Sequence, residues 1–186
     1  MSDARFVLIR HGESTWNAAG RWQGQGDPPL SKRGRTQATR LALQLANEGI
    51  DVIVASDLAR AAETAAILGE ALGLEAESDP RLRELDVGRW TGRTRGEIEA
   101  LDAGELRRFE SGAPGARAGG GESRADVCDR GHPALLDIAA RHPGRCVAVV
   151  AHLGLIRALL PGTQLDNAAW CRASREQIAS PPGDGA

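Results

Sequence analysis

The sequence predicts an α/β fold, a three-layer sandwich in which helices cover both faces of a mainly parallel β-sheet. Three short apolar runs, residues 6–9, 52–55 and 146–150, are typical of strands that are buried on both faces. Helical patterns lie between these runs, and such alternation indicates a parallel sheet. No repeat or linker divides the chain. We therefore expect one domain over residues 1–179 and a disordered, Pro/Gly-rich tail over 180–186.

The first helix is expected after the polar stretch that follows the strand over 6–9. Ser31 can act as its N-cap, because a serine oxygen accepts a hydrogen bond from an amide in the first turn. Gly49 closes the helical pattern. Small and aliphatic residues at helical spacing form its predicted buried face, namely Ala38, Leu41, Ala42, Leu45 and Ala46.

A second helix and an edge strand follow the run over 52–55. Ser56 or Asp57 is expected to cap this helix, and Gly73 lies just past its end. The segment 74–78 predicts a further strand at the edge of the sheet. Apolar residues form the predicted inner face of the helix, namely Leu58, Ala61, Ala62, Ala65, Leu68 and Leu72.

The second half of the chain combines weaker helical patterns with the clearest strand. Residues 93–109 favour a helix, and the glycine-rich stretch 111–121 predicts a mobile loop. A helix should begin at Ser123 and break near Pro133, because an interior proline removes a backbone donor and clashes with the preceding turn. The remaining elements are the strand over 146–150, a short helix over 155–160 and a last strand over 169–173.

Composition and charge argue against several classes of protein. A formal net charge of −2 provides no overall attraction to nucleic acid or anionic membranes. Cys128, Cys146 and Cys171 are far apart and form no CxxC pair, so neither a disulfide framework nor a thiolate zinc site is expected. No apolar run fits a signal peptide or a membrane span. We expect a cytoplasmic protein that binds neither nucleic acid nor membranes.

Charged and polar residues directly follow the three buried strands. Arg10 and His11 end the first strand, Arg60 lies just after the second, and His152 follows the third. Ligands of such sheets bind beyond the carboxyl ends of the strands, so two arginines and two histidines should converge there. Each residue alone is more often structural than catalytic. Together at one edge of one sheet, they predict a reactive site for an anion.

The segments that contain these residues resemble the sequence motifs of a known enzyme family. Arg10-His11-Gly12-Glu13, followed by Asn17, is similar to the signature of the histidine phosphatase superfamily, the phosphoglycerate mutase-like enzymes. The matches keep the family's order from about residue 6 to about residue 160. The resemblance therefore implies a phosphoglycerate mutase-like fold. Further matching segments are Gln23-Gly24, Asp27, Pro29-Leu30-Ser31, Gly34, Gln37-Ala38, residues 56–60, Leu82-Arg83-Glu84, Gly121-Glu122-Ser123 and the segment around His152.

The resemblance also implies phosphoryl transfer without a metal or another cofactor. His11 would attack phosphorus through a ring nitrogen and form a phosphohistidine. Arg10 and Arg60 would bind phosphate oxygens as planar forks, and His152 would add a donor, or a positive charge if protonated. Glu84 would protonate the leaving oxygen and then activate the water that hydrolyses the phosphohistidine.

Other predicted contacts lie close to these residues. Asn17 and the backbone near Ser14 would bind the remaining phosphate oxygens. Leu153 stands where the family often has glycine, so its backbone N–H could serve while its side chain narrows the site. Asp86 is the rival of Glu84, but it lies beyond the acid of the family pattern. The predicted phosphate- or substrate-binding residues are Arg10, Ser14, Asn17, Gln23, Gly24, Arg60, His152 and Leu153.

Three other functions fit parts of this pattern: a cofactor-dependent phosphoglycerate mutase-type phosphotransferase, a non-catalytic phosphoester-binding protein and a metal-dependent hydrolase. Mutases usually carry a longer insert after the acid, whereas only 37 residues separate Glu84 from Glu122. A more open, wetter site favours hydrolysis. We therefore predict a phosphomonoesterase, monomeric or homodimeric, for a small phosphomonoester such as a sugar phosphate, glucosyl-phosphoglycerate or α-ribazole phosphate.

Overall fold

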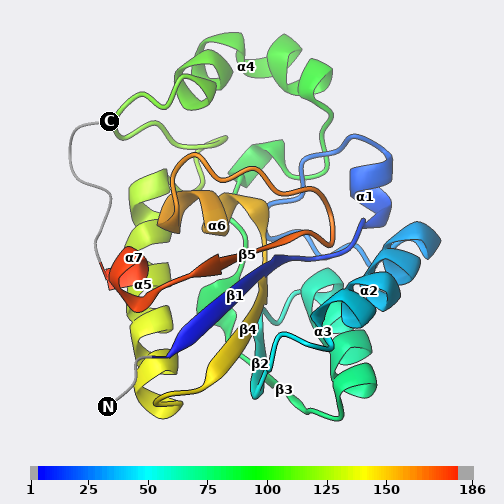
Figure 1. The fold of residues 1–186 in the computed structure, drawn as a ribbon. Helices are drawn as coiled ribbons and strands as arrows, with labels where there is room; N and C mark the ends of the chain where they lie inside the picture. The colour runs from blue at the N-terminus through cyan, green and yellow to red at the C-terminus, as the bar shows by residue number, and fades with distance from the viewer. Residues whose placement is uncertain (1–3, 180–186) are drawn as a thin grey trace.

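The strands form the middle layer of the protein. The computed structural model describes residues 4–179, and its five-stranded sheet has the order β3-β2-β4-β1-β5. Neighbouring strands are parallel except for β5, which is antiparallel to β1 (Figure 1). The predicted α/β class with a mainly parallel sheet is confirmed. The strands are β1 (Arg5–Arg10), β2 (Val52–Ala55), β3 (Ala76–Ser78), β4 (Cys146–Ala151) and β5 (Trp170–Ala173).

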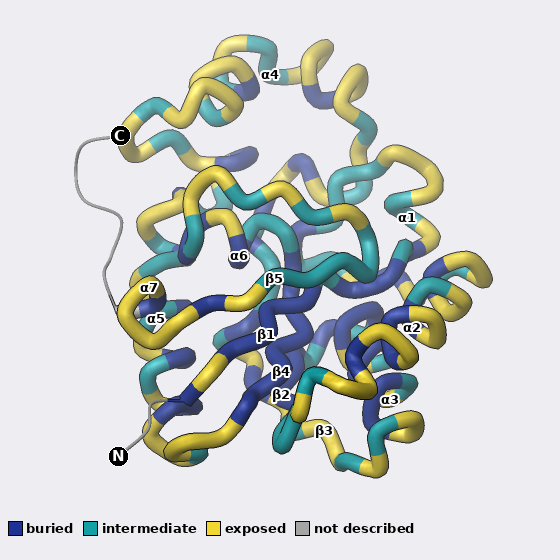
Figure 2. The backbone as a smooth tube through the Cα atoms, in the orientation of Figure 1, coloured by how far each residue is buried: buried dark blue, intermediate teal, exposed yellow. Residues whose placement is uncertain are grey.

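Helices cover both faces of the sheet, because alternate side chains of each strand point to opposite sides. Val7 and Ile9 of β1 pack with the residues of α2 and α3, whereas Phe6 and Leu8 pack with those of α5, α6 and α7. All six residues of β4 are buried, as the dark centre of Figure 2 shows. The covering helices are α2 (Lys32–Leu45), α3 (Ala59–Leu72), α5 (Arg124–Arg141), α6 (Leu153–Leu159) and α7 (Arg175–Ala179).

Helix α4 (Arg95–Glu110) lies apart from the sheet, at the top of Figure 1. An aromatic cluster anchors it: the rings of Trp22 and Trp90 lie 5.5 Å apart, and those of Trp90 and Phe109 lie 6.0 Å apart. The indole N–H of Trp90 also donates to Asp102, where the helix is kinked. The structure adds α1 (Thr15–Ala18) and two 3₁₀ turns, Pro80–Leu82 and Gly88–Trp90, which the apolar patterns did not predict.

Several predicted helix ends are confirmed, and others are wrong. Ser31 caps α2, and Gly73 ends α3 in the left-handed conformation. Neither Ser56 nor Asp57 caps α3. Leu58 takes the N-cap position, and the amide of Ala59 donates to Asp27 at 2.6 Å. A carboxylate from a distant loop thus replaces the local cap. Two residues predicted on buried helix faces, Ala46 and Ala62, are exposed.

Pro133 does not break α5, contrary to the prediction. The helix runs from Arg124 to Arg141 with the proline inside it. Tertiary packing outweighs the lost backbone donor, because the inner face of α5 is buried against α6 and α7. Gly131 permits the close approach, since a Cβ there would lie 2.8 Å from the side chain of Leu155.

The stretch 111–121 is a loop, as predicted, but its end is packed. Ala118 is buried, and a Cβ on Gly121 would lie 2.3 Å from the carbonyl oxygen of Asp86. Its mobility stays a prediction, and the predicted tail over 180–186 lies outside the described residues. No helix in the described part of the chain is long and apolar enough to cross a membrane.

Candidate active site

The sheet brings the predicted residues together at its carboxyl edge. β1 and β4 are neighbours in register, and the amide of His11 donates to the carbonyl of Ala151 at 3.0 Å. His152 follows directly, and the two imidazole rings lie 5.1 Å apart. Arg60 lies in the first turn of α3, after β2. The predicted convergence of two arginines and two histidines is present.

The imidazole of His11 is fixed in one tautomer. Its Nδ1 lies 2.6 Å from the carbonyl oxygen of Gly12, which can only accept, so Nδ1 carries the proton. Nε2 therefore has the lone pair, and the Nε–H of Arg60 donates to it at 3.2 Å. Burial, and then the charge of Arg60, lowers the pKa of His11 well below its usual value. His11 is thus neutral at pH 7, as a nucleophile must be.

The two arginines are directed by backbone carbonyls. Arg60 is fully buried and donates to the carbonyl oxygens of Gly24 and Gly26, both at 2.8 Å. Arg10 donates to the carbonyl of Leu165 at 2.8 Å, and its buried Nε has no hydrogen-bond partner in the described part of the chain. Among residues 4–179, neither guanidinium has a carboxylate oxygen within 4.0 Å. Since unpaired buried charges are costly, this arrangement favours a bound anion.

His152 is also fully buried, and neither of its ring nitrogens has a hydrogen-bond partner in the described residues. Burial, and then the charge of Arg60, lowers the pKa of His152 well below its usual value, so this imidazole is neutral as well. Unpaired polar atoms in the interior cost free energy unless a ligand satisfies them. His152 therefore completes the set of donors expected around a phosphate.

The carboxylate of Glu84 accepts three hydrogen bonds from backbone amides. Oε1 accepts from Leu85 at 2.9 Å and from Leu155 at 3.2 Å, and Oε2 accepts from Gly154 at 3.2 Å. The side chain of Glu84 thus lies beside the first turn of α6, and this turn begins directly after His152. Burial lowers the pKa of both arginines of the site, and the negative charge of Glu84 is the largest opposing influence on each. The acid therefore lies close to both guanidinium groups.

Asp86, the rival acid, has a different environment. Its Oδ1 accepts from the amide of Gly88 at 2.9 Å, two residues along the chain, where the 3₁₀ turn Gly88–Trp90 begins. Such a bond is typical of an aspartate that shapes a turn. This environment favours Glu84 for the acid role, as the sequence analysis does.

The other predicted side chains form a hydrogen-bonded group beside the Arg10-His11 signature. Ser14 caps α1, accepts from the amide of Asn17 at 3.0 Å and donates to Gln23 at 2.6 Å. The backbone of Gly24 takes a positive φ of 49° and directs its carbonyl to Arg60. Leu153 is the first residue of α6 and is half-buried.

A loop near the far end of the chain, which no sequence pattern predicted, also contacts the Arg10-His11 signature. Asn167 donates to the carbonyl of His11 at 3.3 Å and to the side chain of Asn17 at 3.1 Å. The next amide, that of Ala168, donates to the carbonyls of Arg10 and His11, both at 3.1 Å. Ala168 takes a positive φ of 58°, which is unusual for a residue other than glycine. The loop thus fixes the backbone on which His11 stands.

In the described part of the chain, no group of three or more His, Cys, Asp or Glu side chains is placed so that it could hold a metal ion. Cys128, Cys146 and Cys171 are free thiols in this structure.

A family model described as the histidine phosphatase superfamily (branch 1) matches residues 6–175, a range that includes every predicted site residue. Glucosyl-3-phosphoglycerate phosphatase of Mycobacterium tuberculosis is 42% identical over 167 residues, covering 86% of this chain and 74% of the relative. Phosphoserine phosphatase 1 of Hydrogenobacter thermophilus is 39% identical, with 83% and 74% covered. Probable phosphoglycerate mutase GpmB of Salmonella newport is 37% identical, with 89% and 77% covered. The solved mycobacterial glucosyl-3-phosphoglycerate phosphatase complexed with VO3 is 40% identical, with 91% and 92% covered and a TM-score of 0.84.

Proposed function

The chain belongs to the histidine phosphatase superfamily, and on this premise we propose that it hydrolyses a small phosphomonoester through a phosphohistidine on His11. The observation that best supports this activity is the pairing at His11. A neutral, buried imidazole presents its Nε2 beside Arg60, in a site whose two arginines have no carboxylate partner among the described residues. Such a site can bind a phosphoryl group and attack it.

In the first half-reaction, Nε2 of His11 would form a bond to phosphorus while the bond from phosphorus to the leaving oxygen breaks. Arg10, Arg60 and His152 would bind the equatorial oxygens, where the negative charge is spread. The hydrogen bond from Arg60 to Nε2 would pass to a phosphate oxygen when the substrate binds. Glu84 would give its proton to the leaving oxygen.

In the second half-reaction, water would replace the imidazole on phosphorus. Glu84, now ionised, would take a proton from the attacking water. The bond between Nε2 and phosphorus would break, its electron pair would return to His11, and inorganic phosphate would leave. No step of this sequence requires a metal ion, because the guanidinium groups supply the positive charge.

The relatives support a small phosphorylated metabolite as substrate. Two of them are phosphatases named for glucosyl-3-phosphoglycerate and phosphoserine, and we propose the same class of substrate for this chain. The match to a probable phosphoglycerate mutase keeps phosphotransfer as a second candidate. The short connection between Glu84 and Glu122 favours hydrolysis over that alternative. We further infer one catalytic domain over 1–179 that acts in the cytoplasm as a monomer or homodimer.

The test is an activity panel run both with and without EDTA. It includes p-nitrophenyl phosphate, glucosyl-3-phosphoglycerate, phosphoserine and α-ribazole phosphate, each with wild type and His11→Ala. We expect release of inorganic phosphate by the wild type and none by the variant. Loss of activity with EDTA would contradict the metal-free reaction. Interconversion of phosphoglycerate isomers that exceeds phosphate release would favour the mutase.

A further inference from the structure

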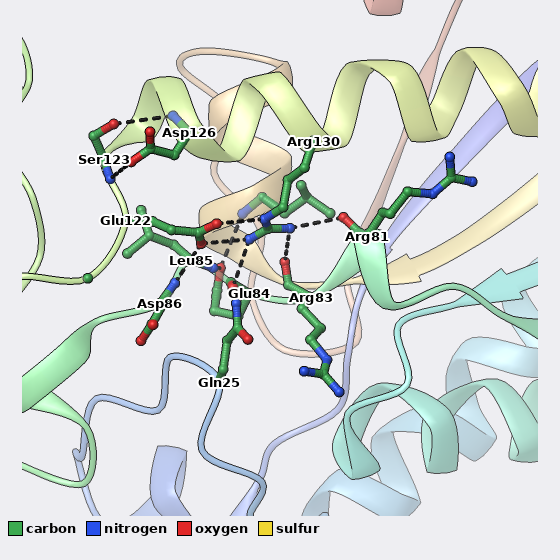
Figure 3. Close-up of polar contacts among 12 residues, drawn as sticks. Gln25, Arg81, Arg83, Glu84, Leu85, Asp86, Glu122, Ser123, Asp126 and Arg130 are labelled. Atoms are coloured by element: carbon green, nitrogen blue, oxygen red, sulfur yellow. Dashed lines mark hydrogen bonds and ion pairs between the residues drawn. The ribbon is translucent and has the colours of Figure 1, made fainter.

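A single arginine outside the predicted site contacts the backbone around the proposed acid. Arg130 lies on α5, and its side chain is 20% exposed. Its Nη1 donates to the carbonyl oxygens of Arg81 at 2.9 Å and Arg83 at 2.7 Å. Its Nη2 donates to the carbonyl oxygen of Glu84 at 2.9 Å, as the close-up in Figure 3 shows.

The remaining donors of Arg130 go to one carboxylate. Nε and Nη2 contact the two oxygens of Glu122 at 2.8 Å and 2.9 Å (Figure 3). A guanidinium has five N–H groups, and all five are therefore used by protein acceptors. Arg130 consequently has no N–H left for a phosphate, which distinguishes it from Arg10 and Arg60.

Glu122 contacts the backbone on the other side of Glu84, at Asp86. Its Oε2 accepts from the amide of Asp86, and its own amide donates to the carbonyl of Asp86, both at 2.9 Å. Burial alone would raise the pKa of Glu122, but hydrogen bonds from Arg130 and from the amide of Asp86 outweigh it and lower this pKa. Glu122 is therefore anionic at neutral pH. Arg130 and Glu122 together contact the backbone on both sides of Glu84.

These contacts matter because no regular secondary structure holds this segment. Residues 83–87 belong to no helix or strand. The polar groups of such a backbone need partners from elsewhere in the chain, and side chains can supply them. The carbonyl oxygens of Arg81, Arg83 and Glu84 all accept from one rigid guanidinium group, which leaves the backbone over residues 81–84 little freedom.

We propose that Arg130 is a positioning residue for Glu84. It directs the acid toward the leaving oxygen through the main chain and takes no part in binding the phosphate. This inference rests on the proposed function of Glu84 as the proton donor. It predicts that removal of Arg130 impairs the proton step selectively.

Leaving groups of different basicity separate the proton step from the rest of the reaction. When the bond from phosphorus to oxygen breaks, the electron pair remains on the leaving oxygen. An alkoxide is strongly basic and needs the proton of Glu84, whereas p-nitrophenolate is stable without it. The ratio kcat/KM reports the reaction through formation of the phosphohistidine, in which this oxygen leaves.

The test compares Arg130→Met and Arg130→Lys with wild type on p-nitrophenyl phosphate and on phosphoserine. Misplacement of a catalytic group by about 1 Å can cost about 10²-fold in rate. We expect kcat/KM to fall by about that factor on phosphoserine and by no more than about 3-fold on p-nitrophenyl phosphate. The matched control is Arg141→Met. Arg141 lies on the same helix, and its exposed ion pair with Glu77 is away from Glu84. The Arg141→Met variant should therefore keep the wild-type kcat/KM on both substrates.

A double-mutant cycle with Glu84→Gln gives the second readout. If Arg130 acts through Glu84, Arg130→Met should add little to the loss already caused by Glu84→Gln. Parallel losses on both substrates, additive losses in the cycle, or unchanged values for both variants would overturn the proposal. If Arg130→Met does not fold, Arg130→Lys provides the comparison, because it keeps the charge but loses the fork. Failure of the proposed phosphatase activity can be told apart from failure of the Arg130 proposal, because in the first case the wild type would hydrolyse neither substrate.

Discussion

A methyl group on Gly154 would press directly on the proposed acid. A Cβ built at this position lies 2.3 Å from Oε1 of Glu84 and 3.3 Å from Cβ of Leu85, whereas ordinary contact begins at 3.4 Å. In Gly154→Ala the carboxylate oxygen must therefore move by about 1 Å. A displacement of that size can cost about 10²-fold in rate, which corresponds to about 2.7 kcal/mol of transition-state stabilisation.

The same substitution should not harm the helix itself. Gly154 lies inside α6 and does not take a positive φ, and alanine is favoured over glycine in helices by about 1 kcal/mol. The assay is kcat/KM on phosphoserine, with thermal unfolding as a check on the fold. The matched control is Gly96→Ala in α4, where a Cβ has open space. Wild-type kcat/KM in a folded Gly154→Ala variant would refute the assigned position of the acid.

Three further predictions concern pH, the aromatic cluster and the loop at Asn167. Burial lowers the pKa of His11 and His152 in the folded chain. Below about pH 6.5 these two histidines are therefore protonated in the unfolded chain but stay neutral in the folded one. Urea unfolding should then show stability falling by up to about 1.4 kcal/mol per pH unit for each histidine, and a flat profile between pH 7 and 5 would contradict this. Trp90→Ala empties a fully buried site and should cost about 3–5 kcal/mol in equilibrium unfolding, with a loss below 1 kcal/mol counting against the packing described. Asn167→Ala removes the hydrogen bonds to His11 and Asn17 and should weaken the binding of inorganic phosphate about tenfold, as measured by calorimetry. An unchanged affinity would show that this loop does not contribute to the phosphate site.

The arrangement of the strands and of the candidate site residues could be predicted because it depends on short-range signals. The apolar runs of β1, β2 and β4 indicate buried parallel strands, and the carboxyl ends of such strands meet at one edge. Any polar residues directly after them must then converge. This rule predicts that Arg10, His11 and His152 lie close together, and the structure confirms it for the backbones of β1 and β4 and for the two imidazole rings.

Contacts between distant segments gave no comparable signal. Arg130 binds the carbonyl of Glu84 across 46 positions, and Asn167 binds that of His11 across 156 positions. A main-chain carbonyl is present at every residue, so nothing in the residue types marks these partners. The cap of α3 by Asp27 and the uninterrupted α5 at Pro133 have the same origin. In each case tertiary structure overrides a local rule.

The most direct test of the central claim is the chemical identity of the phosphorylated residue. Glu84→Gln should still form the phosphohistidine from p-nitrophenyl phosphate, because that leaving group needs no proton, but should hydrolyse it slowly. Rapid quenching at alkaline pH, followed by mass spectrometry of the peptides, should therefore find phosphate on His11. Addition of His11→Gln should abolish it. Phosphate on another residue, or turnover by His11→Gln at the wild-type rate, would contradict the account.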